Sequence, residues 1–153
     1  MTFSVVSIKT AAGAAGIAAA AILTAATASA DPDVLPFGRM AQMSGAGGSE
    51  VTDYTVKNLQ PSGRNDGVWY SDVTVTAARG VVTPIIGDFN ARAADGTTYT
   101  TIEGANPDGL TNQPIPPGGA AHGRIFFQVN NGPAPDSVVY NTGGNRDTVI
   151  WKS

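Results

Sequence analysis

The chain has 153 residues, of which 42% are hydrophobic and 14% charged, with no cysteine and a net charge of −3 at neutral pH. The lack of cysteine excludes disulfide bonds and a lipid-bearing cysteine. The negative charge disfavours nucleic acid and anionic membrane surfaces as partners, because both are polyanionic.

The first 30 residues have the features of a secretory signal peptide. Lys9 and the amino terminus supply positive charge, a charge-free, alanine-rich run covers residues 11–28, and an A-x-A cleavage signal ends at Ala30. A membrane anchor is the alternative, but a run made mostly of alanine is only weakly apolar. We therefore expect cleavage after Ala30, secretion to the extracellular space without a membrane anchor, and a single mature domain of residues 31–153.

Beyond residue 30, the hydrophobic pattern has a period of two, which is typical of β-strands. The clearest run is 68–78, where Trp69, Val73 and Val75 alternate with polar side chains. The predicted strands, in chain order, are 37–43, 51–56, 68–78, 85–93, 97–102, 124–129, 137–141 and 148–151.

Eight short strands separated by turn residues predict an all-β, antiparallel β-sandwich, because a parallel sheet would need helical crossovers. Asp95 and Gly96 are the strongest hairpin signal and should join 85–93 to 97–102. Trp69 shares the apolar face of its strand and is expected in the core. Trp151 is expected to close the sheet near the C-terminus.

Side chains suited to catalysis or metal binding are few. His122 is the single histidine and is expected at an exposed strand edge, not as a catalytic base. Residues 106–109 (NPDG) predict a turn and not a calcium loop, since the further acidic ligands are missing. We therefore expect no cofactor, no metal and no enzymatic activity.

Two arginines, Arg79 and Arg92, leave two interpretations open. Either of them can form an ion pair with Asp88 or Asp72 that fixes the register of the strands, or the two can form an anion-binding pair. We favour the structural interpretation.

Several blocks of sequence resemble one known family. The blocks are 79–84 (RGVVTP), 89–92 (FNAR), 94–96 (ADG), 123–125 (GRI) and 150–151 (IW). In their order and spacing they resemble the mycobacterial secreted immunogenic protein family, the MPT sixty-three family. The resemblance implies an exported, immunoglobulin-like β-sandwich, an antigen that is regarded as non-enzymatic and whose biochemical role is undetermined.

The longest segment without regular structure is 104–120, which has 17 residues and is rich in proline. Loops of this kind carry recognition in many sandwiches, although a plain connection is equally compatible with the pattern. The candidate interaction residues are Asn106, Asp108, Leu110, Asn112, Pro114 and Pro117.

The leading hypothesis is a secreted, monomeric binding or interaction module whose partner is an unknown protein or surface ligand. One alternative is a cofactor-free extracellular hydrolase that uses a pair of carboxylates. The other is a structural component of the cell envelope.

Overall fold

The computed structural model describes residues 21–23, 31–104, 106–142 and 148–153. Most of the predicted signal peptide, including its cleavage site, therefore lies outside the described residues. The exception is the three-residue strand β1, which pairs in parallel with β3.

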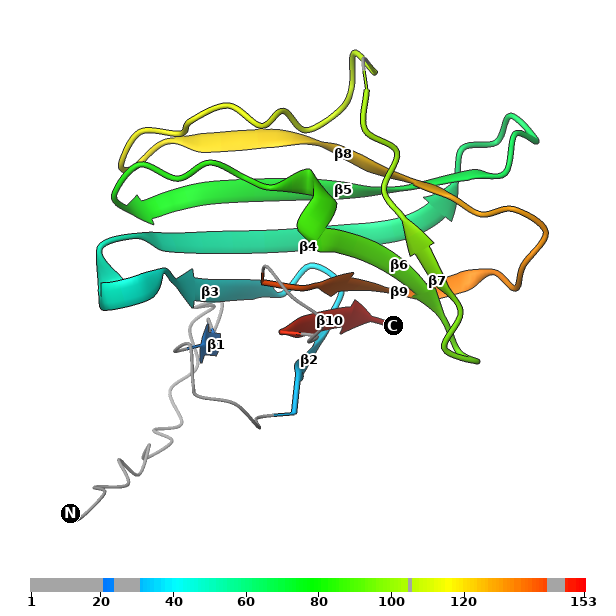
Figure 1. Ribbon diagram of the computed structural model, residues 1–153, viewed down its shortest axis with the longest axis horizontal. Helices are drawn as coiled ribbons and strands as arrows, with labels where there is room; N and C mark the ends of the chain where they lie inside the picture. The colour runs from blue at the N-terminus through cyan, green and yellow to red at the C-terminus, as the bar shows by residue number, and fades with distance from the viewer. Residues whose placement is uncertain (1–20, 24–30, 105, 143–147) are drawn as a thin grey trace, which may run out of the picture.

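The described chain forms two five-stranded sheets. The first has the order β1-β3-β4-β5-β8, and Figure 1 shows β3, β4, β5 and β8 side by side in that order. Its strands are β1 (Ala21–Leu23), β3 (Met40–Ser44), β4 (Val51–Pro61), β5 (Val68–Arg79) and β8 (Ala120–Gln128). The second has the order β2-β10-β9-β6-β7 and consists of β2 (Asp33–Pro36), β10 (Val149–Lys152), β9 (Pro135–Tyr140), β6 (Phe89–Ala93) and β7 (Thr98–Thr100). Two short 3₁₀ helices, Ala46–Gly48 and Ile86–Asp88, complete the described elements.

The order of the strands is that of an immunoglobulin-like sandwich. If β4 is taken as strand A, then β4-β5-β8 correspond to A-B-E and β10-β9-β6-β7 to G-F-C-C′. The predicted all-β sandwich is therefore confirmed. The position beside β8, where strand D would lie, is taken by the irregular segment that precedes β8.

The predicted strands are confirmed with shifted ends. The run 37–43 begins pairing only at Met40, because Gly38 has a φ of +85° and Arg39 donates its N–H to the Pro36 carbonyl, which makes a turn. The hairpin at Asp95 and Gly96 is present and joins β6 to β7. Strand β2 was not predicted, since its four residues include a proline and pair in parallel with the distant β10.

The core lies between the two sheets and is formed by the alternating apolar side chains of both. The side chains of Trp151, Phe89, Phe127 and Ile125 are among the largest that are fully buried. Trp69 lies on the inner face of β5, as expected. It is only half-buried, because it lies near the end of the strand, where it packs against the margin of the core.

Candidate functional site

A groove of about 360 Å³ lies on the first sheet at the end where β4 turns into β5. Its floor is formed by outward-facing side chains of β5 and β8, chiefly Tyr70, Arg124 and Phe126. They alternate with Ser71, Ile125 and Phe127, which are buried toward the core. The period of two in these strands thus fixes which side chains reach the groove.

The register between β5 and β8 brings the floor residues together. Tyr70 is opposite Phe126, and their ring centroids are 6.2 Å apart at an angle of 45°. Asp72 is opposite Arg124 and accepts a hydrogen bond of 3.1 Å from its Nε. The Arg124 guanidinium lies 4.4 Å from the centroid of the Tyr70 ring, a cation–π contact.

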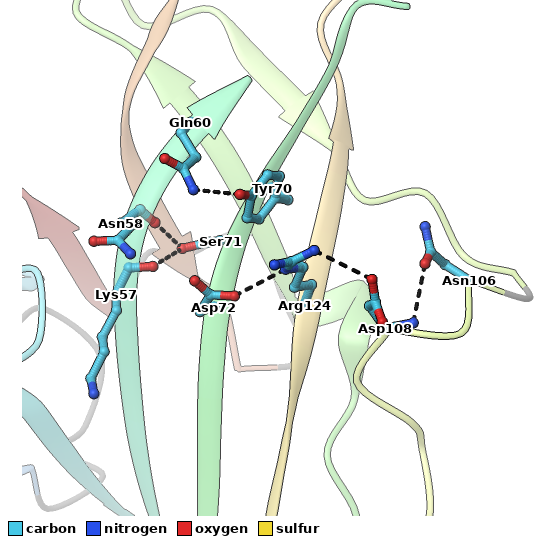
Figure 2. A network of polar contacts seen from close by, with 9 residues as sticks. All are labelled: Lys57, Asn58, Gln60, Tyr70, Ser71, Asp72, Asn106, Asp108 and Arg124. Atoms are coloured by element: carbon cyan, nitrogen blue, oxygen red, sulfur yellow. Dashed lines mark hydrogen bonds and ion pairs between the residues drawn. The ribbon is translucent and has the colours of Figure 1, made fainter. Parts of the chain in front are cut away.

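Arg124 links the floor of the groove to one of its walls. Figure 2 shows its side chain between two carboxylates, with Nη1 3.3 Å from Oδ2 of Asp108 on the side opposite Asp72. The hydrogen bond to Asp72 is the main cause that raises the pKa of the Arg124 guanidinium. The group therefore stays cationic at every physiological pH.

The turn between β4 and β5 forms the first wall. Ser62 donates its hydroxyl to Oδ1 of Asp66 at 2.7 Å, and the backbone N–H of Val68 donates to the same oxygen at 2.9 Å. These two bonds, the one from Ser62 first, lower the pKa of Asp66 below its ordinary value. Arg64 also lines this wall, and its backbone N–H donates to the Ser62 hydroxyl.

The second wall is formed by Ile102, Gly104, Asn106 and Asp108, which lie along the edge of β8 that faces away from β5. The N–H of Ile102 donates to the Phe126 carbonyl at 2.8 Å, and the N–H of Arg124 donates to the Asp108 carbonyl at 2.8 Å. Two residues later, the N–H of Leu110 donates to the Arg124 carbonyl at 2.9 Å. The backbone of the segment thus occupies the edge that a further strand would otherwise pair with.

Residues 106–109 form the predicted turn. The N–H of Gly109 donates to the Asn106 carbonyl at 2.9 Å, and the Asn106 side-chain oxygen accepts from the N–H of Asp108 at 3.2 Å. Among the described residues, no group of three or more His, Cys, Asp or Glu side chains gathers where it could hold a metal ion.

The structure separates the six residues of the candidate interaction loop. Asn106 and Asp108 line the groove. Leu110, by contrast, is 5% exposed and packs in the core, so it presents almost no surface to a partner. Asn112 accepts a hydrogen bond from the N–H of Ile86, and Pro114 and Pro117 are exposed near the other end of β5, outside the lining of the groove.

Three other polar residues discussed in the sequence analysis are not part of the lining of the groove: His122, Asp72 and Arg79. His122 is exposed, and its Nδ1 lies 3.0 Å from the Thr74 hydroxyl. Asp72 pairs with Arg124, an arginine that the sequence analysis did not name as its partner. Arg79 donates instead to the backbone carbonyl of Gly48 at 3.3 Å.

Sequence reasoning missed Tyr70, Phe126, Arg124, Arg64 and Asp66 as members of one site. Two of them carried a usable signal: Tyr70 and Phe126 are aromatic residues on the polar faces of alternating strands. Large rings on such faces indicate a contact surface more often than a core. The charged residues carried no comparable signal, because the pairing of β5 with β8 brings them together from distant parts of the sequence.

The charged groups of the groove suit binding better than proton transfer. A general acid needs a pKa raised toward neutrality, whereas that of Asp66 is lowered and that of Arg124 is raised away from it. Both groups keep their charge at neutral pH and can act as fixed hydrogen-bonding partners for a ligand.

No helix in the described part of the chain combines the length and the hydropathy needed to cross a bilayer.

Comparison with known proteins assigns the chain to one family. Residues 32–151 match the family described as a domain of unknown function, DUF1942. Immunogenic protein MPB63 of Mycobacterium bovis and immunogenic protein MPT63 of Mycobacterium tuberculosis are each 43% identical over 86 residues, which are 56% of this chain and 53% of theirs. The matched part of the chain therefore spans about half the length of these curated relatives.

The crystal structure of a secreted protein from M. tuberculosis, MPT63, superimposes with a TM-score of 0.73 at 36% sequence identity. The match covers 82% of this chain and 100% of that one.

Proposed function

The chain belongs to the DUF1942 family, and from this premise we propose that it is a secreted, non-enzymatic binding protein that contacts its partner through the groove on β5 and β8. The observation that carries the proposal is the outward-facing aromatic floor, Tyr70 and Phe126, between one wall that carries Arg64 and Asp66 and another that carries Asp108. Aromatic rings at the centre of a polar rim are typical of contact surfaces.

Export and recognition by a host immune system are part of the same proposal. The relatives from M. bovis and M. tuberculosis are named immunogenic proteins, and the solved relative is titled a secreted protein. The signal-like features of residues 1–30 agree with export, and we propose that this segment is removed after Ala30. The intact mass of the protein recovered from the culture medium tests the cleavage site.

A hydrolase remains the second candidate, because two carboxylates, Asp66 and Asp108, line one groove. Glycoside hydrolysis needs one carboxyl group that is protonated near neutral pH. The hydrogen bonds that Asp66 accepts from Ser62 and Val68 act in the opposite direction. Substitution of both aspartates by asparagine separates the candidates, since hydrolysis would be lost whereas binding would be reduced only in part.

The central experiment is affinity capture from envelope extract and from host-cell surface proteins, with the secreted protein as bait. Replacement of the whole 104–120 segment is unsuitable, because Leu110 and Ile115 are buried in the core. We therefore compare the native protein with Phe126→Ala in the groove and with His122→Ala, which lies on the same strand outside the groove.

A partner that is retained by the native protein and by His122→Ala but lost by Phe126→Ala supports the proposal. A partner retained by all three proteins contradicts the groove as the contact surface. Turnover of a glycan substrate that disappears in the double asparagine variant would favour the hydrolase.

A further inference from the structure

The charges that line the groove are balanced in sign. Two arginines, Arg64 and Arg124, and two aspartates, Asp66 and Asp108, face it. A ligand with a net charge would be attracted by one pair and repelled by the other. A ligand without net charge that both donates and accepts hydrogen bonds meets no such conflict.

The charged side chains retain bonding capacity after their internal bonds are made. Asp66 accepts its bonds from Ser62 and Val68 at Oδ1, and Asp108 is bonded to Arg124 through Oδ2, so the second oxygen of each carboxylate has no hydrogen bond to another residue that the structure describes. Arg124 uses Nε and Nη1 in its ion pairs and leaves Nη2 available. Hydroxyl groups are the natural complement, because each can donate to a carboxylate while it accepts from a guanidinium.

The floor offers an apolar surface of limited size. Arg124 covers the Tyr70 ring at 4.4 Å, so the ring of Phe126 is the aromatic surface left for a ligand, next to Ile102, which is 39% exposed. An aromatic face is electronegative and attracts weakly positive C–H groups. The C–H face of a sugar ring combines such groups with hydroxyls around its edge.

Strand addition by a peptide is disfavoured at this place. Peptides of that kind bind the free edge of a sheet through backbone hydrogen bonds. The edge of β8 that borders the groove already pairs with the backbone of Ile102, Asp108 and Leu110. The groove thus offers side chains on a sheet face and not an open edge.

We infer that the groove binds a neutral oligosaccharide, with a sugar ring packed on Phe126 and its hydroxyls bonded by Arg124, Asp66 and Asp108. The inference rests on the proposed function and names the class of ligand for the same site. The volume of about 360 Å³ lies at the lower end of the range of small-ligand sites, which suits one or two sugar rings of such a chain.

An array of neutral gluco-, manno-, galacto- and arabino-oligosaccharides tests the inference, with acidic oligosaccharides and short peptides on the same surface. The protein is expressed from its full coding sequence and tested beside Phe126→Leu, which keeps an apolar side chain but removes the aromatic face. His122→Ala serves as the matched control on the same strand. Thermal unfolding of each variant verifies that it is folded.

We expect neutral oligosaccharides to bind, Phe126→Leu to weaken that binding about fivefold to tenfold, and His122→Ala to leave it unchanged. Chemical-shift changes at the amides of residues 64–70 and 124–126 on addition of the same sugars would place the ligand in the groove.

Three outcomes would overturn the inference. If Phe126→Leu leaves sugar binding unchanged, the groove is not the sugar-binding site. Binding of acidic sugars or peptides alone, lost in Phe126→Leu, would refute the neutral-sugar class and leave the proposed function intact. If no probe binds although affinity capture yields a groove-dependent partner, the ligand class is again wrong and the proposed function stands.

Discussion

Trp151 and Trp69 are the two tryptophans of the chain, and their environments differ. Trp151 is 0% exposed, and its indole N–H donates to the Arg39 carbonyl at 2.9 Å. Its ring is thus buried in the core while its polar group keeps a hydrogen-bond partner. Trp69 lies on the inner face at the end of β5, and water reaches part of its ring. The burial of Trp69 that its strand pattern predicts is therefore only partial.

Replacing each tryptophan by alanine should give unequal losses of stability. Trp151→Ala is expected to lower the free energy of unfolding by about 3–5 kcal/mol, because it leaves a large cavity and an unpaired carbonyl. Trp69→Ala should lower it by less, since part of the ring is already exposed. Urea unfolding of both variants measures the difference, and an equal or larger loss for Trp69→Ala would contradict the two placements.

At the scale of the element, the close approach of the segment 104–119 to β8 requires a glycine in that strand, Gly123. A Cβ atom built on Gly123 would lie 2.4 Å from the nitrogen and 2.5 Å from the Cα of Leu110. Backbone atoms cannot approach a Cβ so closely. The segment and β8 cannot move apart without breaking the backbone hydrogen bonds between Arg124 and its partners Asp108 and Leu110. The missing side chain therefore permits the segment to lie against the sheet.

Gly123→Ala should detach this segment from β8 at Leu110. We expect a loss of about 1–3 kcal/mol in the free energy of unfolding, as for other overpacked sites, and faster hydrogen exchange at the amides of Leu110 and Arg124. The control is His122→Ala, one residue away and exposed. Unchanged exchange at both amides in Gly123→Ala would show that the segment is held by other contacts.

The strands were predictable where their two faces differ in polarity. β5 and β8 alternate between core and solvent, so their positions follow from local sequence. β2 has no such pattern, and only its pairing with β10, more than a hundred residues away, makes it a strand. The groove could be predicted only in part, for Asn106 and Asp108, because its other residues come from three separate segments that the sheet register brings together.

At the scale of the whole molecule, an aromatic cluster joins the two sheets. Tyr54 of β4 lies 5.0 Å from Tyr140 of β9 and 5.6 Å from Phe89 of β6, measured between ring centroids. Burial raises the pKa of both tyrosines, with interactions with Asp88 adding to the effect. Each phenol is therefore held in its neutral form in the folded state.

The stability of the protein should consequently fall at alkaline pH. Below the ordinary tyrosine pKa of 10.0, both the folded and the unfolded chain keep their phenol protons, and the tyrosines contribute no dependence on pH. Above it, the unfolded chain releases protons that the folded chain retains, so the free energy of unfolding should fall by about 1.4 kcal/mol per pH unit for each tyrosine until its folded pKa is reached. Urea unfolding from about pH 8 to 11 measures the slope.

Tyr54→Phe provides the control for this slope, because it removes one titrating group and keeps the ring in the cluster. Its alkaline slope should be shallower than that of the native protein. A slope that is the same in both proteins would assign the alkaline loss to other groups.

The attachment of the segment 104–119 to the sheets also bears on the resistance of the protein to proteolysis. Proteases preferentially nick exposed, mobile loop tips, and this segment is the longest loop that the sequence predicts beyond residue 30. Hydrogen bonds hold its backbone at Asp108, Leu110, Ile115 and Gly118, and Leu110 and Ile115 are buried. Cleavage next to these anchored positions should therefore require local detachment of the segment from the sheets, which lowers its rate.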